Sequence, residues 1–138
     1  MKIFLDANIC LDLLDTKRST SKKSLEWYMF NKDNERYEFY FSSDFITTFY
    51  YILTQKRKYS PKKSLLAIET LCEDMTPWYT NHFDFLSAKS DFFNALLEDF
   101  EDLIVLNSAF RLGVEQFITN DKQLLILQKF KNFHILQP

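Results

Sequence analysis

The segment that decides the fold opens the chain: KIFLDANICLDLL, residues 2–14. Its apolar run over residues 2–5 has the length and character of a buried strand, and apolar residues recur at helical spacing over residues 9–14. Asp6 stands between these two patterns, so the sequence predicts a strand, a sharp turn and a helix in direct succession. This succession is the first half of a βαβ unit, which favours a parallel sheet.

The rest of the chain continues this alternation. The sequence predicts further strands over residues 37–41, 76–80, 114–119 and 133–136 and helices over residues 19–31, 42–53, 61–72, 83–97, 99–112 and 121–129. Gly113 is the only glycine, and it fits a left-handed C-cap at the end of the helix over residues 99–112. We therefore expect one α/β domain over residues 1–138, with three layers (α/β/α) around a mainly parallel central sheet of four to five strands.

The composition excludes several classes of function. A dinucleotide-binding turn or a P-loop needs more than one glycine, because only glycine lets the backbone approach phosphates so closely. The two cysteines and two histidines show no zinc spacing, and neither histidine accompanies a Ser or Cys nucleophile motif. The start of the chain has no apolar run long enough for a signal or membrane helix, so we expect a cytoplasmic protein.

Charge is distributed unevenly along the chain. Residues 1–70 carry 12 Lys and Arg against 9 Asp and Glu, whereas residues 71–138 carry 5 against 10. Basic residues of the first half cluster at predicted helix ends, namely Lys17-Arg18, Lys22-Lys23, Lys56-Arg57-Lys58 and Lys62-Lys63. These clusters could flank an acidic site and hold RNA phosphates, or they could only solubilise the surface. Lys56, Arg57 and Lys58 are our candidates for RNA contact.

Four aspartates are expected at the carboxyl edge of the sheet, where parallel α/β sheets bind their ligands. Asp6 follows the first strand and Asp121 follows the strand over 114–119, while Asp99 and Asp102 begin the helix leading into that strand. If the two strands are neighbours, the carboxylates converge, and their repulsion calls for a hard divalent cation such as Mg²⁺ or Mn²⁺. The same residues could instead be ordinary helix N-caps and first-turn charges.

Three segments resemble the motifs of the PIN-domain nucleases. LDANICLDLL (5–14), DFEDLIVLNSAF (99–110) and FITND (117–121) are similar to the first, third and fourth motifs of that family in order and spacing. The end of the chain, FHILQP (133–138), is similar too, so the resemblance covers essentially the whole chain. Most small single-domain members resemble VapC toxins of type II toxin–antitoxin systems. These are magnesium-dependent endoribonucleases, inhibited by a cognate antitoxin and usually dimeric.

The resemblance also implies roles for individual residues. Asp6, Asp102 and Asp121 match the catalytic aspartates that bind metal, and Asp99 matches an extra acid that would support metal binding. Two polar positions beside the site match as well: Asn8 and Thr119. The implied mechanism uses one or two Mg²⁺ ions (or Mn²⁺) to orient a water for in-line attack on an RNA phosphodiester.

The second motif departs from the family pattern. The family usually has an acid in the helix after the second strand, but SSDFITTFYYIL (42–53) places Thr48 there. A hydroxyl group carries no negative charge, so metal binding should be weaker. Asp44 lies one helical turn earlier and could substitute, or it could serve only as an N-terminal helix charge. A catalytically impaired RNA- or protein-binding module is therefore the alternative function, and a phosphotransfer domain ranks third.

Three consecutive aromatic residues suggest an interface. Phe49, Tyr50 and Tyr51 fall within one predicted helix, and a single helix face cannot bury all three. At least one should lie at an interface or over the site, and homodimerisation is our preferred use for it.

Overall fold

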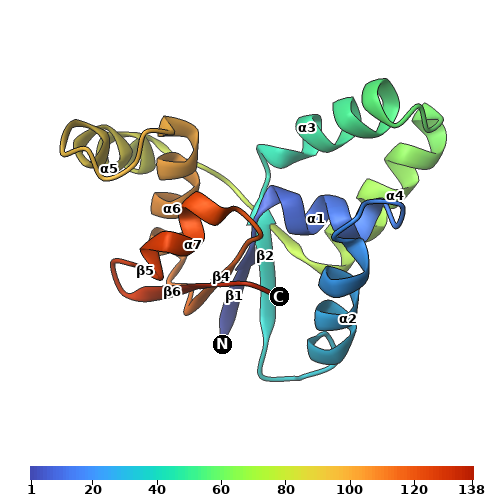
Figure 1. Ribbon diagram of the computed structural model, residues 1–138, viewed down its shortest axis with the longest axis horizontal. Coiled ribbons are helices and arrows are strands. Elements are labelled where there is room, and N and C mark those ends of the chain that lie inside the picture. The colour runs from blue at the N-terminus through green and yellow to red at the C-terminus, as the bar shows by residue number, and fades with distance from the viewer.

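The computed structural model describes residues 1–138, and a six-stranded sheet runs through the centre of the molecule (Figure 1). The strand order is β3-β2-β1-β4-β6-β5, and every pairing is parallel except that of β5 with β6. The strands are β1 (Lys2–Leu5), β2 (Glu38–Ser42), β3 (Thr76–Trp78), β4 (Gln116–Ile118), β5 (Lys129–Phe130) and β6 (Phe133–Leu136). The predicted α/β class and mainly parallel sheet are confirmed.

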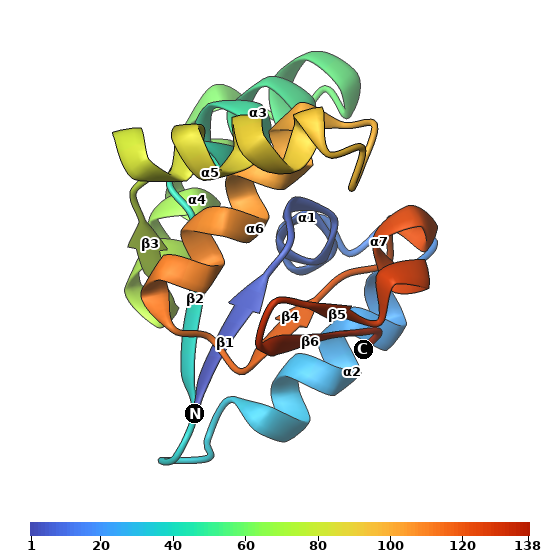
Figure 2. The same cartoon turned by 90° about the vertical axis from the view of Figure 1, so that its left-hand side faces the viewer.

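Seven α-helices surround this sheet, and a π-helix extends one of them. They are α1 (Ala7–Leu14), α2 (Ser21–Asn31), α3 (Phe45–Tyr51) continued by the π-helix η1 (Ile52–Lys56), α4 (Pro61–Asp74), α5 (His82–Phe93), α6 (Phe100–Leu112) and α7 (Lys122–Leu127). Side chains from α1, α2, α3 and α4 cover one face of the sheet, and those from α5, α6 and α7 cover the other. Figures 1 and 2 show these two helical layers with the sheet between them.

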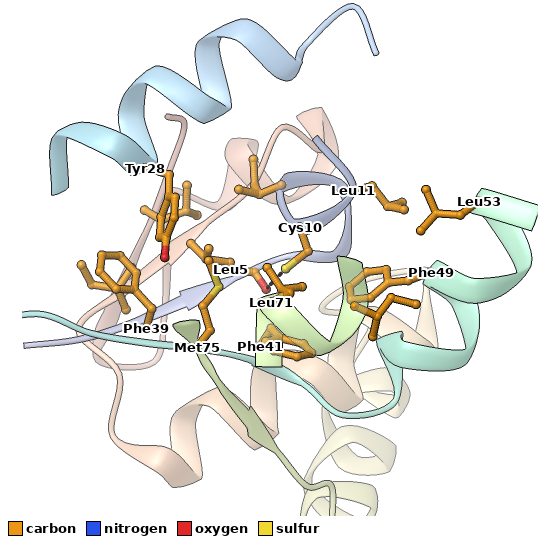
Figure 3. Close-up of a cluster of buried hydrophobic side chains, with 14 residues drawn as sticks. Leu5, Cys10, Leu11, Tyr28, Phe39, Phe41, Phe49, Leu53, Leu71 and Met75 are labelled. Carbon is orange, nitrogen blue, oxygen red and sulfur yellow. Dashed lines mark hydrogen bonds between the residues drawn. The ribbon is translucent and has the colours of Figure 1, made fainter. Parts of the chain in front are cut away.

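The two faces of β1 account for the layering. Ile3 and Leu5 point into the first buried cluster, whereas Phe4 points into the second and stacks on Phe117 of β4 with ring centroids 5.4 Å apart. Figure 3 shows the first cluster, where Leu5 lies among side chains of α1, β2, α3 and α4. Burying such a side chain is worth about 1.5–3 kcal/mol, so a strand buried on both faces anchors both layers.

The sheet has six strands, whereas the sequence predicts four or five. The additional strand, β5, has only two residues, and the sequence predicts helix through residue 129. The helix stops earlier because Gln128 adopts a positive φ of 59°, which turns the chain back into β5. Similarly, the helix predicted to reach residue 97 ends at Phe93, shortly before Ala95 with its φ of 56°.

The aromatic run on α3 divides between the core and the surface. Phe49 is fully buried, whereas Tyr50 and Tyr51 are 38% and 53% exposed. The prediction that one helix face cannot bury all three is confirmed, and the use of an exposed one at an interface stays a prediction. None of the helices is both long enough and apolar enough to span a membrane.

The left-handed cap at Gly113 yields a stability prediction. Its φ is 82°, and a β-carbon placed there would meet no atom within 4 Å, so Gly113→Ala adds backbone strain but no clash. We expect the change to lower the free energy of unfolding by about 1 kcal/mol, measured by urea denaturation. Ala95→Gly, the reverse change at another positive φ, is the control and should raise it. A Gly113→Ala protein as stable as the wild type would contradict the strain assignment.

Candidate active site

The carboxyl ends of two neighbouring strands form the centre of the candidate site. β1 pairs with β4 in parallel, with Leu5 opposite Ile118, and the Asp6 backbone N–H donates to the Ile118 carbonyl at 2.9 Å. Asp6 therefore leaves the sheet beside the segment 119–121. This adjacency is the condition that the predicted convergence of aspartates required (Figure 1).

Asp6 is buried and held in place by three hydrogen bonds. Its Oδ1 accepts from the Ala7 backbone N–H at 2.8 Å, which caps α1. Its Oδ2 accepts from Thr119 Oγ1 at 2.7 Å and from Asn8 Nδ2 at 3.0 Å. Burial nevertheless raises the pKa of this carboxyl, and the charge of Asp121 acts in the same direction. The structure fixes the orientation of this carboxylate but leaves its charge uncompensated.

Thr119 and Asn8 connect Asp6 to Asp121. Thr119 Oγ1 accepts from the Asp121 backbone N–H at 3.0 Å and from Asn8 Nδ2 at 3.2 Å. Asn8 Oδ1 in turn accepts from the Asn120 backbone N–H at 2.9 Å. Asp121 accepts from the Gln123 backbone N–H at 2.8 Å and so caps α7. The polar positions named from the sequence therefore hold the two strand ends in register.

Asp102 and Asp99 reach the same region from the start of α6. Asp99 caps this helix by accepting from the Asp102 backbone N–H at 3.2 Å. The pKa of Asp102 is raised to about 7, first by burial and then by the charges of Asp99, Asp6, Asp121 and Glu101. Carboxylates from β1, β4 and α6 therefore interact through space at one edge of the sheet, and their mutual repulsion disfavours full ionisation.

Asp6 differs from the other buried aspartates of this chain. Asp12, Asp15 and Asp84 are also buried, and each has an arginine nitrogen within ion-pair distance. The partners are Arg18 at 2.8 Å, Arg57 at 2.7 Å and Arg111 at 3.0 Å, respectively. Asp6 has no such partner, so its region lacks the positive charge that burial of a carboxylate normally requires.

The donors around Asp6 suit a hydrated divalent cation. As the side chains stand, no three His, Cys, Asp or Glu residues are grouped closely enough to hold one ion between them. Mg²⁺ does not need such a group, because it usually keeps several waters and takes one or two carboxylates together with substrate phosphates. The all-oxygen donors and the uncompensated charge fit Mg²⁺ or Mn²⁺, whereas a closed zinc site would need His or Cys ligands.

Comparisons with solved structures identify the fold. One is the structure of VapBC2 from Rickettsia felis bound to a DNA fragment from its promoter. It aligns with a TM-score of 0.72 and 12% sequence identity, and the alignment covers 99% of this chain and 98% of that chain. Mycobacterium tuberculosis VapC20, described as a sarcin–ricin loop cleaving toxin, aligns with a TM-score of 0.71 and 11% identity, covering 96% and 98%. This is the PIN-domain fold of the VapC toxins.

A further PIN-domain structure, VapBC-1 from nontypeable Haemophilus influenzae, aligns with a TM-score of 0.67 and 18% identity over 99% of this chain and 98% of that chain. By sequence alone the chain matches no family model and no curated protein. The likeness to VapC structures therefore lies in the backbone, and it spans essentially the whole PIN fold.

Thr48 of this PIN fold faces a cavity between α3 and α6. The cavity has a volume of about 300 Å³, and its other lining residues include Asp44, Glu101 and Val105. Asp44 is the N-cap residue of α3 but makes no capping hydrogen bond with its side chain, and its Oδ2 accepts instead from Thr80 Oγ1 at 2.9 Å. Sequence reasoning missed Glu101, although it follows Asp99 in the acidic first turn of α6. Its charge contributes to the raised pKa of Asp102.

Sequence reasoning also missed a buried network centred on Asp12. Besides the Arg18 ion pair, Asp12 accepts from Thr20 Oγ1 at 2.7 Å, Ser24 Oγ at 2.5 Å and Asn120 Nδ2 at 3.3 Å. The network ties α1 and α2 to the residue between Thr119 and Asp121. One signal was available: Asp12 is an acid within the otherwise apolar helical run of residues 9–14.

The structure places the basic candidates around Arg57 at the end of α1 opposite Asp6. Asp6 caps the N-terminus of α1, whereas Arg57 pairs with Asp15 at the C-terminus of the same helix. Lys56 Nζ lies 5.8 Å from the centre of the Tyr51 ring, and exposed Lys58 has a φ of 59°. The role of Lys56, Arg57 and Lys58 in RNA contact stays a prediction. Residues 52–58 lie at the C-terminal end of α1 and residues 6–8 at its N-terminal end. The spacing of these residues in the sequence does not predict this separation.

The raised pKa of Asp102 predicts how stability depends on pH. A carboxyl group whose pKa rises from an ordinary 3.8 to about 7 on folding stabilises the protein below about pH 4, and that stability is lost as the pH rises toward 7. We expect Asp102→Asn to raise the free energy of unfolding by about 1–2 kcal/mol at about pH 8 but not at about pH 4. Urea denaturation at both pH values is the measurement, and an equal effect at both would refute the assigned pKa.

Proposed function

We propose that the protein is a Mg²⁺-dependent endoribonuclease that hydrolyses RNA phosphodiesters, with Mn²⁺ able to replace Mg²⁺. The proposal depends on one observation: Thr119 joins Asp6 to the backbone of Asp121 at the carboxyl edge of the sheet, and the charges of both acids help raise the pKa of Asp102. The PIN fold supports it, since one VapC structure with that fold belongs to a sarcin–ricin loop cleaving toxin. By the same likeness, we propose that the protein is the toxin of a type II toxin–antitoxin system and acts in the cytoplasm.

In this mechanism Asp6, Asp102 and Asp121, with Asp99 in support, would hold one or two ions. A bound ion supplies an activated water and stabilises the charge that develops on the phosphate. Thr119 and Asn8 fix the Asp6 carboxylate by donating to its Oδ2. Asp102, whose pKa is raised to about 7, is about half protonated at neutral pH, and a bound cation would displace this proton to solvent. No covalent intermediate with the protein is needed.

The test is cleavage of a mixed structured RNA by purified protein with Mg²⁺ or Mn²⁺ and with EDTA. We expect cleavage with either metal, loss of cleavage in EDTA, and a decrease of at least about 100-fold in Asp6→Asn. Asn keeps the size of the side chain but removes its charge. Asp33→Asn, an exposed acid in the turn after α2, is the matched control and should cleave normally. Cleavage that survives both EDTA and Asp6→Asn would come from a contaminating nuclease.

The same experiment distinguishes the alternative, a catalytically impaired PIN module that binds RNA or protein. Thr48 is the specific observation for it, because a hydroxyl stands where the family usually has an acid. If no metal supports cleavage and calorimetry detects no Mg²⁺ binding, the impaired module becomes the better description. Mg²⁺ binding without cleavage of the mixed RNA would point instead to a narrow substrate.

Two protein partners belong to this proposal. The first is a cognate antitoxin, supported by the likeness to VapBC complexes from Rickettsia felis and Haemophilus influenzae. The second is another copy of the chain. Large aromatic side chains are exposed on α5, where Phe83 and Phe93 are 70% and 75% exposed, and on α3, where Tyr51 is exposed. Both helices lie beyond the carboxyl ends of the strands in Figures 1 and 2.

Dimerisation can be tested at Phe93. We expect the wild type to sediment as a dimer at micromolar concentration, and Phe93→Glu to weaken the dimer by at least about tenfold, because a charge would be buried at the interface. Phe30→Glu is the matched control, since Phe30 is 88% exposed on α2, outside α3 and α5. A monomeric wild type, or equal weakening by both substitutions, would refute dimerisation through α5.

A further inference from the structure

A cavity with basic walls lies at the C-terminal end of α1. Its volume is about 310 Å³, and its polar wall includes Asp15, Lys17, Tyr59 and Lys63. The apolar wall includes Leu53, at the junction of α3 and α4. We call it the α1–α4 cavity. It is separate from the acidic residues, which gather at the other end of α1.

The α1–α4 cavity carries positive charge that no carboxylate neutralises. Asp15, its acid, is already engaged, because Arg57 Nε lies 2.7 Å from Oδ2 and Tyr59 Oη donates to Oδ1 at 2.7 Å. The four ion pairs of the structure use Arg18, Arg57, Arg111 and Lys131 as their cations. Lys17 and Lys63 therefore have no acidic partner within ion-pair distance, and both line the cavity.

Two hydrogen bonds hold Tyr59 in the wall of this cavity. The Tyr59 backbone N–H donates to the Leu53 carbonyl at 2.9 Å, and its hydroxyl is fixed on Asp15. Lys17 Nζ lies 5.9 Å from the centre of the Tyr59 ring. An aromatic ring, two unpaired ammonium groups and an apolar wall are the features that hold a nucleotide, through its base and its phosphate.

The placement of Lys63 is unfavourable for folding alone. It lies in the first turn of α4, which has no acid, and a helix N-terminus disfavours positive charge. Lys62 beside it adds a second cation to the same turn. A bound anion would relieve this repulsion, so the lysines are better explained by a ligand than by the stability of α4.

We infer that the α1–α4 cavity binds one nucleotide of the RNA substrate, with Lys17 and Lys63 on its phosphate, at a distance from the bond that is cleaved. This inference rests on the proposed ribonuclease function. Asp6 and Asp15 cap opposite ends of α1, whose eight residues span about 12 Å. A stacked strand advances about 3.4 Å per nucleotide, so the subsite lies about four nucleotides from the acidic residues.

The experiment compares wild type with Lys17→Ala/Lys63→Ala in binding a fluorescein-labelled single-stranded RNA of about 12 nucleotides in EDTA, across a range of KCl concentrations. We expect the variant to bind about tenfold more weakly, and its log–log salt slope to be smaller by about 0.7, since one phosphate of the strand is no longer neutralised. Lys89→Ala/Lys129→Ala, which removes the same charge from α5 and β5, is the matched control and should bind like wild type. Urea denaturation verifies that both variants are folded.

Cleavage with Mg²⁺ gives a second readout. In the Lys17→Ala/Lys63→Ala protein, KM for the long RNA should rise about tenfold with kcat retained, because the lost contacts lie away from the cleaved bond. A dinucleotide is too short to reach from the acidic residues to the cavity, so its kcat/KM should be the same in the variant and the wild type. The ratio of kcat/KM for the long RNA to kcat/KM for the dinucleotide should therefore fall about tenfold in the variant. Unequal effects on the two substrates would thus confirm a remote subsite.

Three outcomes would overturn the inference. Equal weakening by the control pair would mean that only overall charge matters. An unchanged Lys17→Ala/Lys63→Ala protein, with RNA still bound and cleaved, would refute the subsite and leave the ribonuclease intact. Wild-type protein that neither binds nor cleaves RNA, but binds poly-glutamate through the two lysines, would refute both and assign the cavity to an acidic protein segment.

Discussion

The parallel pairing of β1 with β4 is the constraint on which the candidate site depends. It sets Leu5 opposite Ile118 and brings Thr119 Oγ1 to 2.7 Å from Asp6 Oδ2, across 113 residues of sequence. A slip of one residue in this register would exchange the faces of the strand, moving Phe4 and its stacked partner Phe117 out of the second core cluster. The packing that stabilises the sheet therefore also fixes the position of Asp6.

An arginine partner distinguishes the structural buried aspartates from Asp6 in the candidate site. Asp12, Asp15 and Asp84 each meet an arginine, and such pairs let a carboxylate remain charged inside a protein. Around Asp6 and Asp102 the neighbouring charges are negative, and the pKa of both groups is raised. An arrangement that only served stability would add a cation here, as it does three times elsewhere. The missing charge is the physical reason to expect a metal ion.

The sequence predicted more of the fold than of the candidate site. Apolar runs and caps located most helices and strands, because local periodicity and local capping determine these elements. β5 was missed because two residues after a positive φ at Gln128 leave no periodic signal. Glu101 and the Asp12 network were missed because their roles come from long-range packing, and Thr48 faces a cavity that only the approach of α3 to α6 creates.

The charged residues at the ends of α1 stabilise that helix, whereas those at the start of α4 do not. At α1 the acidic cap Asp6 lies at the positive end of the helix dipole, where its charge is favourable, and Arg57 compensates the carboxylate of Asp15 at the negative end. The dipole thus offsets part of the cost of an uncompensated Asp6. At α4 the order is reversed, since Lys62 and Lys63 occupy the positive end. Helix stability explains the first arrangement and opposes the second, which is the physical reason for proposing a ligand at the α1–α4 cavity.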